Sequence, residues 1–227
     1  MGYNRITLED VRRNEEFSTY VSKGNKVLAV MGYTDHSAAH TMKVAKGAAD
    51  ILSRFGYSER EIELARIAGY THDIGNMVNR ADHAHTGAII AFNILTRMNM
   101  SPDEIATIVS AIGHHDESTG RAISCVSAAI IIADKTDVRR TRVRNKDFAT
   151  FDIHDRVNYA VEKSALDIEI DEEQNRKDIN LKIKLDISIC SVMEYFEIFL
   201  TRMLMCSKAA EFLGASFHLY ANDAKLV

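Results

Sequence analysis

The sequence lacks the features that would place it in a membrane, outside the cell or on nucleic acid. No apolar run in its 227 residues approaches the length that spans a bilayer. The opening stretch Met1-Gly-Tyr-Asn-Arg-Ile6 has no apolar core of a signal peptide. The net charge of −4 gives no general attraction to nucleic acid or to an anionic membrane. We therefore expect a cytoplasmic protein that binds a small molecule, with neither a membrane nor nucleic acid as partner.

Cysteine is also scarce, which excludes a disulfide framework. Cys125, Cys190 and Cys206 lie in apolar stretches, their number is odd, and no two are spaced as CxxC. Such cysteines are typical of small buried side chains in a reducing compartment. A cysteine nucleophile has no activating neighbour in the sequence.

Apolar periodicity and helix-start signals indicate helices joined by short turns in the first two-thirds of the chain. Ser58-Glu-Arg-Glu61 is a capping box, and Ser101-Pro-Asp-Glu104 places the only proline at the first position of a helix. Gly24 is a candidate interruption of the first helix. We predict helices over residues 9–30, 35–55, 58–72, 82–98, 101–112 and 123–138.

After Asp147 the pattern changes from helical to mixed. Residues 157–170 and 180–187 alternate apolar and polar side chains, residues 191–212 read as a helix, and residues 216–220 read as a last strand. The helix is apolar nearly all round over 192–205, which suits either a homodimer contact or docking on the helical part. We predict a mainly α chain: a helical domain over 1–147 with its core at about 30–145, and a small α+β (ββαβ) appendage over 148–227 with dimerisation as one candidate role.

Histidine is concentrated in the helical part. Seven of the nine histidines lie between His36 and His115, and His72 is followed directly by Asp73. Imidazole and carboxylate together are ligands for Zn, Mn, Fe, Co or Ni. An adjacent His and Asp at a helix end can bind one ion through His and bridge to a second through Asp, as a two-metal phosphoester hydrolase requires.

The order of these residues resembles the HD superfamily of metal-dependent phosphohydrolases. The contexts His40-Thr-Met-Lys, His72-Asp-Ile-Gly75 and His83-Ala-His-Thr-Gly-Ala88 are similar to the segments of that family, as is Ala133-Asp134. The resemblance covers roughly residues 30 to 145 and implies an HD-type helical bundle. It has little to say about the appendage.

The resemblance also implies a ligand set and cofactors. His40, His72 and Asp134 would hold one ion, and Asp73 would bridge to a second, so that His72 and Asp73 form the catalytic pair. His83 with one or both of two adjacent histidines would complete the second site; we prefer His114 and keep His115 as a further ligand. The expected cofactors are two divalent transition-metal ions, with Mn, Fe, Co, Ni and Zn as candidates and Mg as a further one.

Basic residues near the ligands are candidates for substrate binding. Lys135 and Arg139 open a basic run after Asp134, and Arg80 follows the His-Asp pair; an arginine fork suits a phosphate, although a solvated helix end is an equally good interpretation of the run. His36 shares a helix face with His40, and it is a candidate to contact substrate or a metal, or a partly exposed side chain.

These observations predict a phosphohydrolase, a phosphomonoesterase or phosphodiesterase, that cleaves a nucleotide or other small phosphoester. Asn76 and Asp116-Glu-Ser-Thr-Gly-Arg121 depart from the HD-GYP branch, which disfavours cyclic-di-GMP as the substrate. The alternatives are an HD-fold di-iron oxygenase and a non-catalytic metal-binding regulatory module.

Overall fold

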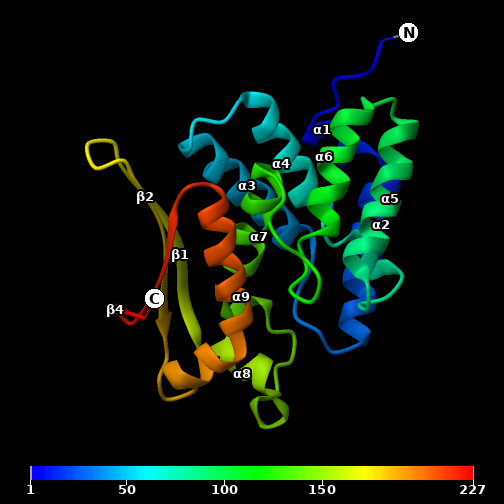
Figure 1. Cartoon of the computed structure of the whole chain (residues 1–227). Helices are drawn as coiled ribbons and strands as arrows, with labels where there is room; N and C mark the ends of the chain where they lie inside the picture. Colours follow the sequence, from blue (N-terminus) through cyan, green and yellow to red (C-terminus); the bar gives the residue numbers. More distant parts are fainter. Residues whose placement is uncertain (1, 227) are drawn as a thin grey trace.

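A computed structural model describes residues 2–226, and its first part is a bundle of helices (Figure 1). The elements in order are α1 (Leu8–Arg13), α2 (Glu15–Val30), α3 (Ala38–Arg54), α4 (Glu59–Thr71), the 3-10 turn η1 (Ile74–Met77), α5 (His83–Arg97), α6 (Pro102–Gly113), α7 (Cys125–Lys135) and the 3-10 turns η2 (Arg140–Arg142) and η3 (Phe148–Thr150).

Side-chain caps set the starts of these helices. The Ser58 and Ser101 hydroxyls accept hydrogen bonds from backbone amides in the first turns of α4 and α6, as the sequence predicts. The first predicted helix is in fact two, because Asn14 ends α1 and caps α2. Gly24 does not interrupt α2; an added Cβ there would lie 3.1 Å from the backbone N of Met77, so the glycine permits close packing on η1.

The second part of the chain is a four-stranded sheet with helices. It comprises α8 (Ile153–Ala160), β1 (Val161–Asp171), β2 (Arg176–Leu185), α9 (Val192–Phe212), β3 (Ser216–Ala221) and the short β4 (Ala224–Lys225). β1 pairs antiparallel with β2, β2 runs parallel to β3, and β3 pairs antiparallel with β4. The predicted ββαβ order is confirmed, except that Val157 to Ala160 end a helix instead of beginning a strand, because Asp152 caps α8 just upstream.

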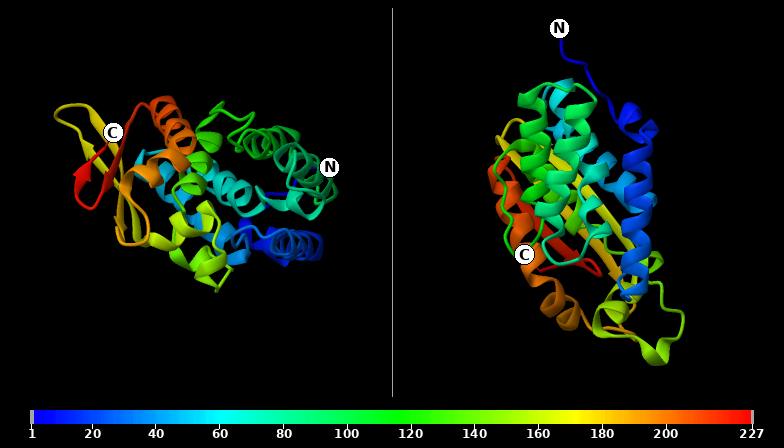
Figure 2. Two further views of the ribbon diagram at one scale, coloured as in Figure 1. Left: turned by 90° about the horizontal axis from the view of Figure 1, so that it is seen from below. Right: turned by 90° about the vertical axis from the view of Figure 1, so that its right-hand side faces the viewer.

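Helix α9 joins the two parts. It packs against α7 on one side and β3 on the other, and it lies between the sheet and the bundle when the molecule is viewed from below (Figure 2). Buried apolar side chains of both parts form one continuous cluster that runs from Ile6 to Ala221. Of the two roles considered for residues 192–205, docking on the helical part is therefore observed, whereas a homodimer and the boundary at 147/148 stay predictions. No helix among residues 2–226 is both long enough and apolar enough to cross a membrane.

Candidate metal centre

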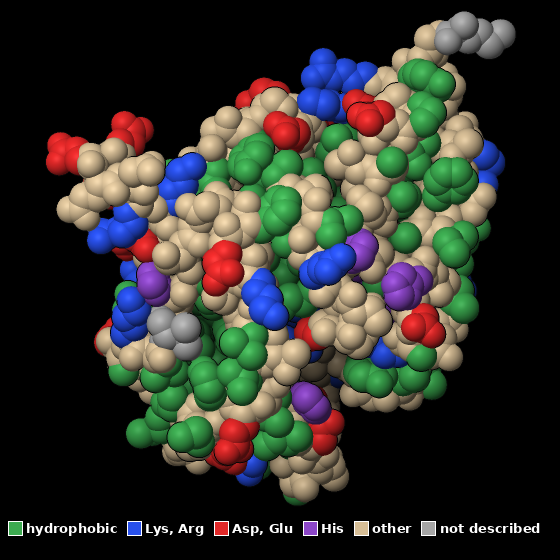
Figure 3. Space-filling model, in the orientation of Figure 1, with side chains coloured by type: hydrophobic (Ala, Val, Ile, Leu, Met, Phe, Trp, Pro, Cys, Tyr) green, Lys and Arg blue, Asp and Glu red, His purple; other side chains and the backbone are tan. Residues whose placement is uncertain are grey.

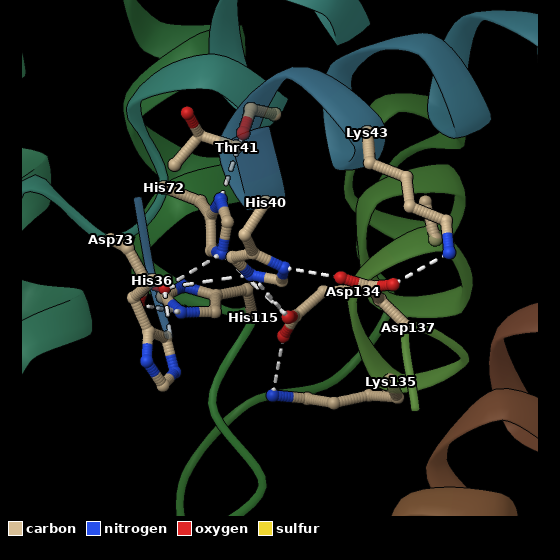
Figure 4. A network of polar contacts seen from close by, with 12 residues as sticks. His36, His40, Thr41, Lys43, His72, Asp73, His115, Asp134, Lys135 and Asp137 are labelled. Atoms are coloured by element: carbon tan, nitrogen blue, oxygen red, sulfur yellow. Dashed lines mark hydrogen bonds and ion pairs between the residues drawn. The ribbon is translucent and has the colours of Figure 1, made fainter. Parts of the chain in front are cut away.

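Five helical elements bring histidines and aspartates to one point between α3, α4 and α7 (Figure 4). His40 lies in the first turn of α3, and His72 and Asp73 stand where α4 ends and η1 begins. The other contributions come from helix ends: His83 begins α5, His115 follows the end of α6, and Asp134 lies in the last turn of α7.

Close backbone packing fixes the His-Asp pair relative to α5. A Cβ added at Gly75 would lie 2.0 Å from the carbonyl O of His83 and 2.6 Å from the backbone N of Gly87. No side chain fits at that distance, so only glycine lets η1 approach α5 closely enough. This contact explains the glycine of the segment His72-Asp-Ile-Gly75.

The two carboxylate oxygens of Asp73 face two different groups of ligand atoms. Oδ2 lies 3.2 Å from His72 Nε2 and 3.7 Å from His40 Nε2. Oδ1 lies 3.4 Å from His83 Nε2 and 3.8 Å from His115 Nε2. Ligands that are each about 2.0–2.2 Å from one ion stand roughly 3–3.5 Å apart. The spacing suits a carboxylate that bridges two sites.

Asp134 completes the first group of ligand atoms. Its Oδ1 lies 3.3 Å from His40 Nε2 and 3.7 Å from His72 Nε2. Ligand atoms of His40, His72 and Asp134 all lie within 4.8 Å of one another, and so do those of His72, Asp73 and His115. Both sets consist of residues predicted from the sequence.

Every histidine of the centre is held by its Nδ1 atom, which leaves Nε2 for a ligand. His72 Nδ1 donates to Gly69 O over 2.8 Å, His83 Nδ1 to Arg80 O over 3.0 Å, and His115 Nδ1 to Ile112 O over 2.6 Å. His40 Nδ1 bonds instead to a carboxylate, as described below. A hydrogen bond at one ring nitrogen fixes the tautomer and orients the other toward a metal.

The unpaired nitrogens test whether a metal fits, and they support it. His40 Nε2 and His72 Nε2 are buried without a hydrogen-bond partner among the described residues. His83 Nε2 and His115 Nε2 face each other at 3.1 Å, although both rings already donate through Nδ1. Two lone pairs at that distance repel each other; Arg80 Nη1 lies 3.3 Å from His83 Nε2, and a metal ion beside both nitrogens would relieve the repulsion further. This set of donor atoms therefore fits a metal ion.

The electrostatics of the centre also favour a cation. Burial opposes ionisation of Asp73, but the neighbouring His72 and His36 hold the pKa of this carboxyl well below its usual range. Burial would lower the pKa of His72, but the carboxylates of Asp73 and Asp134 outweigh it and raise this pKa to about 10. For His83 burial dominates and lowers the pKa to about 4. The carboxylates thus stay charged, and they stabilise positive charge between them.

Asp137 binds the Nδ1 side of His40, opposite the Nε2 atom that faces the centre, and it was not among the residues predicted from the sequence. Its side chain is fully buried, and Oδ2 accepts from His40 Nδ1 over 2.7 Å. Lys43 Nζ and Arg139 Nε donate to Oδ1 over 2.7 and 2.8 Å. A carboxylate behind a metal-binding imidazole fixes its ring and raises its basicity. Its position three residues after Asp134, just past the end of α7, is the signal that could have found it.

A cavity of about 430 Å³ opens onto the centre. On the face shown in Figure 3 the surface is hollowed below its middle, and Lys, Arg and His side chains stand around the hollow. Cavities of roughly 300–1,000 Å³ hold small-molecule ligands. Its lining combines predicted residues with others from the appendage, such as Asp155, Asn158 and Arg202.

Of the predicted substrate-binding residues, Arg80 and His36 line this cavity in positions that a ligand could reach. Arg80 Nη1 lies 3.8 Å from Asp73 Oδ1 and 3.3 Å from His83 Nε2. His36 Nε2 lies 4.0 Å from Asp73 Oδ2, and its Nδ1 bonds to Thr34 O over 2.7 Å, so His36 stands at the edge of the centre. Its side chain is 12% exposed, so a partly exposed histidine stays an alternative to a contact with substrate or metal.

Lys135 and Arg139 are engaged with protein groups instead. Lys135 Nζ lies 2.8 Å from Asp134 Oδ2 and 2.9 Å from Glu117 Oε2, so its charge is already neutralised although it lines the cavity. Arg139 binds Asp137 and is absent from the cavity lining. The basic run continues in the same way: Arg142 donates to the carbonyls of Asp35 and Asp137, both over 2.9 Å, and ties the loop after α7 to the start of α3.

Of the two adjacent histidines, the structure favours His115 as the ligand, whereas the sequence analysis preferred His114. His115 is buried and joins the ligand atoms, whereas His114 caps α6 and belongs to neither set. The helix ends at Gly113, so the two side chains leave the backbone in different directions. His85, two residues after His83, is exposed.

The helical bundle thus brings together two His/Asp groups that could hold metal ions, with Asp73 between them. The family model for the HD domain matches residues 38–139, which hold all of these ligands. The chain therefore contains an HD domain over these residues.

One curated protein and one solved structure are similar to this chain. An uncharacterized protein of Methanocaldococcus jannaschii is 24% identical over 166 residues, which cover 63% of this chain and 63% of the relative. The chain thus matches less than two-thirds of that relative's length. The crystal structure of a predicted HD superfamily hydrolase from an uncultured Thermotogales bacterium superposes with a TM-score of 0.43 at 25% identity, and covers 55% of this chain and 67% of the other.

Proposed function

We propose that the protein is a metal-dependent phosphohydrolase that cleaves a small phosphoester, such as a nucleotide, with a metal-activated water. The observation that carries the proposal is the bridging position of Asp73, whose two oxygens face two separate groups of histidine nitrogens. A carboxylate shared between two ligand groups could hold two ions close together, as in the two-metal sites that stabilise the attacking and leaving oxygens of an in-line displacement at phosphorus.

The residues have distinct roles in this proposal. His40, His72 and Asp134 would hold one ion and His83 with His115 a second, while Asp73 would bridge them. Bound ions would supply an activated water and would neutralise charge on the phosphoryl oxygens. Arg80 would bind a non-bridging phosphate oxygen, because its guanidinium already lies beside Asp73 Oδ1 and a cation there would displace it toward the cavity.

Lys135 would act on the centre without touching the substrate. Its ammonium binds Asp134 Oδ2, so the other oxygen, Oδ1, stays directed at His40 and His72. Both Asp134 and Lys135 are thus fixed before any ligand arrives, and such preorganisation limits the reorganisation needed during the reaction.

A phosphate-release screen over nucleotides and sugar phosphates with Mn or Co tests the proposal. We expect release by the wild-type protein and its loss in Asp73→Ala, with His114→Ala as the matched control that keeps activity. Two bound irons without phosphate release would favour an oxygenase, and metal binding without any turnover would favour a regulatory module.

A further inference from the structure

Helix α8, which the sequence analysis did not connect with the centre, supplies acceptor groups to the same cavity. Asp152, His154, Asp155 and Asn158 all line it, and α8 packs against η2, α9 and β1. Asp155 is only 8% exposed. Among residues 2–226, no Lys, Arg or His nitrogen lies within 4.0 Å of its carboxylate.

The environment of Asp155 compensates its charge only in part. Burial and the neighbouring Asp152 carboxylate raise the pKa of Asp155, and hydrogen bonds from the Asn145 side chain and the Asp152 backbone, together with His154, oppose them incompletely. A buried carboxylate without a cation is costly unless a hydrogen-bond donor reaches it. Asp155 lines the cavity, so a ligand there could supply a further donor.

Asn158 adds a second acceptor one helical turn further on. Its side chain is 6% exposed, and Nδ2 donates to the backbone carbonyl of His154 over 2.9 Å. That bond fixes the amide group and leaves the carbonyl oxygen Oδ1 as the acceptor for a ligand.

A further metal does not explain these residues. Within residues 2–226, the sets of ligand atoms close enough to hold an ion are those around His72, and neither includes a residue of α8. The remaining interpretation is recognition of a donor-bearing molecule.

Resting on the proposed hydrolase function, we propose that Asp155 and Asn158 select the substrate: a phosphomonoester whose remaining part carries O–H or N–H donors, as a sugar or nucleoside monophosphate does. The phosphate would lie at the metal centre beside Arg80, and the donors would bind the α8 residues. A di- or triphosphate would be disfavoured, because its extra negative charge would meet the carboxylates of Asp152 and Asp155 in the same cavity.

The test measures binding and turnover on the full-length, Mn-loaded protein. Dissociation constants are measured by calorimetry for ribose 5-phosphate, adenosine 5′-monophosphate and adenosine 5′-triphosphate, and kcat and KM for the same compounds and for p-nitrophenyl phosphate, which offers no donors. The variants are Asp155→Asn and Asn158→Leu. Asp167→Asn, at a half-exposed position on β1, is the control with the same chemical change.

We expect wild-type protein to bind at least one of the two monophosphates more tightly than the triphosphate. Asp155→Asn and Asn158→Leu should each weaken that binding by about tenfold or more, with p-nitrophenyl phosphate kinetics within about twofold of wild type. Loss of binding to ribose 5-phosphate and adenosine monophosphate alike would assign the sugar as the recognised part; loss for the nucleotide alone would assign the base.

Unchanged affinity in both variants, a preference for the triphosphate, or no binding of either monophosphate would overturn the assignment. Donor-dependent binding without release of phosphate from any compound would uphold the role of α8 and refute the hydrolase. The binding measurement therefore separates the two failures.

Discussion

Replacing Asp137 with asparagine should weaken metal binding although Asp137 is not a metal ligand. The carboxylate accepts from His40 Nδ1 over 2.7 Å, and it also binds Lys43 and Arg139. Burial disfavours its charged form, but the His40 bond and the Arg142 charge hold the pKa of Asp137 far below its usual range. The structure thus keeps a full negative charge behind the imidazole.

The magnitude follows from that geometry. Loss of a group that orients a metal-binding histidine typically costs about 10–100-fold in metal affinity. Breaking a fully buried ion pair costs about 3–5 kcal/mol, but the Lys43 side chain is 46% exposed and that of Arg139 is 30% exposed, so both can turn to water. We therefore expect a smaller loss of unfolding free energy, about 1–3 kcal/mol.

Titration of metal-free protein with Co or Zn against a competing chelator measures the affinity, and urea unfolding without metal measures the stability. Lys43→Met is the matched control, because it removes a partner of Asp137 and leaves the His40 bond in place. It should keep metal affinity within about threefold of wild type. Equal affinities for Asp137→Asn and wild type would refute the positioning role of Asp137.

Three further predictions concern packing, ligand choice and pH. Gly75→Ala should abolish metal binding and cost more than about 4 kcal/mol, since its Cβ would lie 2.0 Å from a backbone oxygen; Gly113→Ala, whose Cβ would meet only Ala88 Cβ at 3.8 Å, should unfold in urea like wild type. His115→Ala should lose about one metal ion per chain by elemental analysis and His114→Ala none, and the opposite result would restore the sequence preference. Glu104→Gln should lower the free energy of unfolding by about 1 kcal/mol near neutral pH. The reason is that Arg60 of α4 donates to both oxygens of Glu104 and lowers the pKa of this carboxyl from 4.5. That contribution is present above the unfolded pKa and is lost as pH falls through the folded one, so urea unfolding in acid should bring variant and wild type together.

Local signals made most of the fold predictable from the sequence. Ser58 and Ser101 cap their helices as expected, because capping depends on a few neighbouring residues. The errors came where two interpretations share a pattern. Residues 157–160 alternate like a strand, but the Asp152 cap upstream places them in a helix.

The ligand set was predictable because it follows one ordered motif, whereas its surroundings depend on tertiary contacts. Spacing alone could not separate His114 from His115, since that choice depends on where α6 ends. Nothing local connects Asp155 or Arg202 with the centre, because α8 and α9 reach the cavity only through the packing of the appendage on the bundle. Arg139 was a candidate for substrate binding. In the structure its side chain instead binds the buried Asp137, two residues away, and does not line the cavity.

Metal content of the purified protein, measured by elemental analysis after loading with Mn, Co or Fe, tests the central claim most directly. A centre in which Asp73 bridges two groups of histidine nitrogens predicts about two ions per chain for the wild type. Loss of most of this metal is expected in Asp73→Ala, with the helical circular dichroism retained. A wild-type protein that binds no ion under any loading condition, or an Asp73→Ala variant that keeps both, would contradict it.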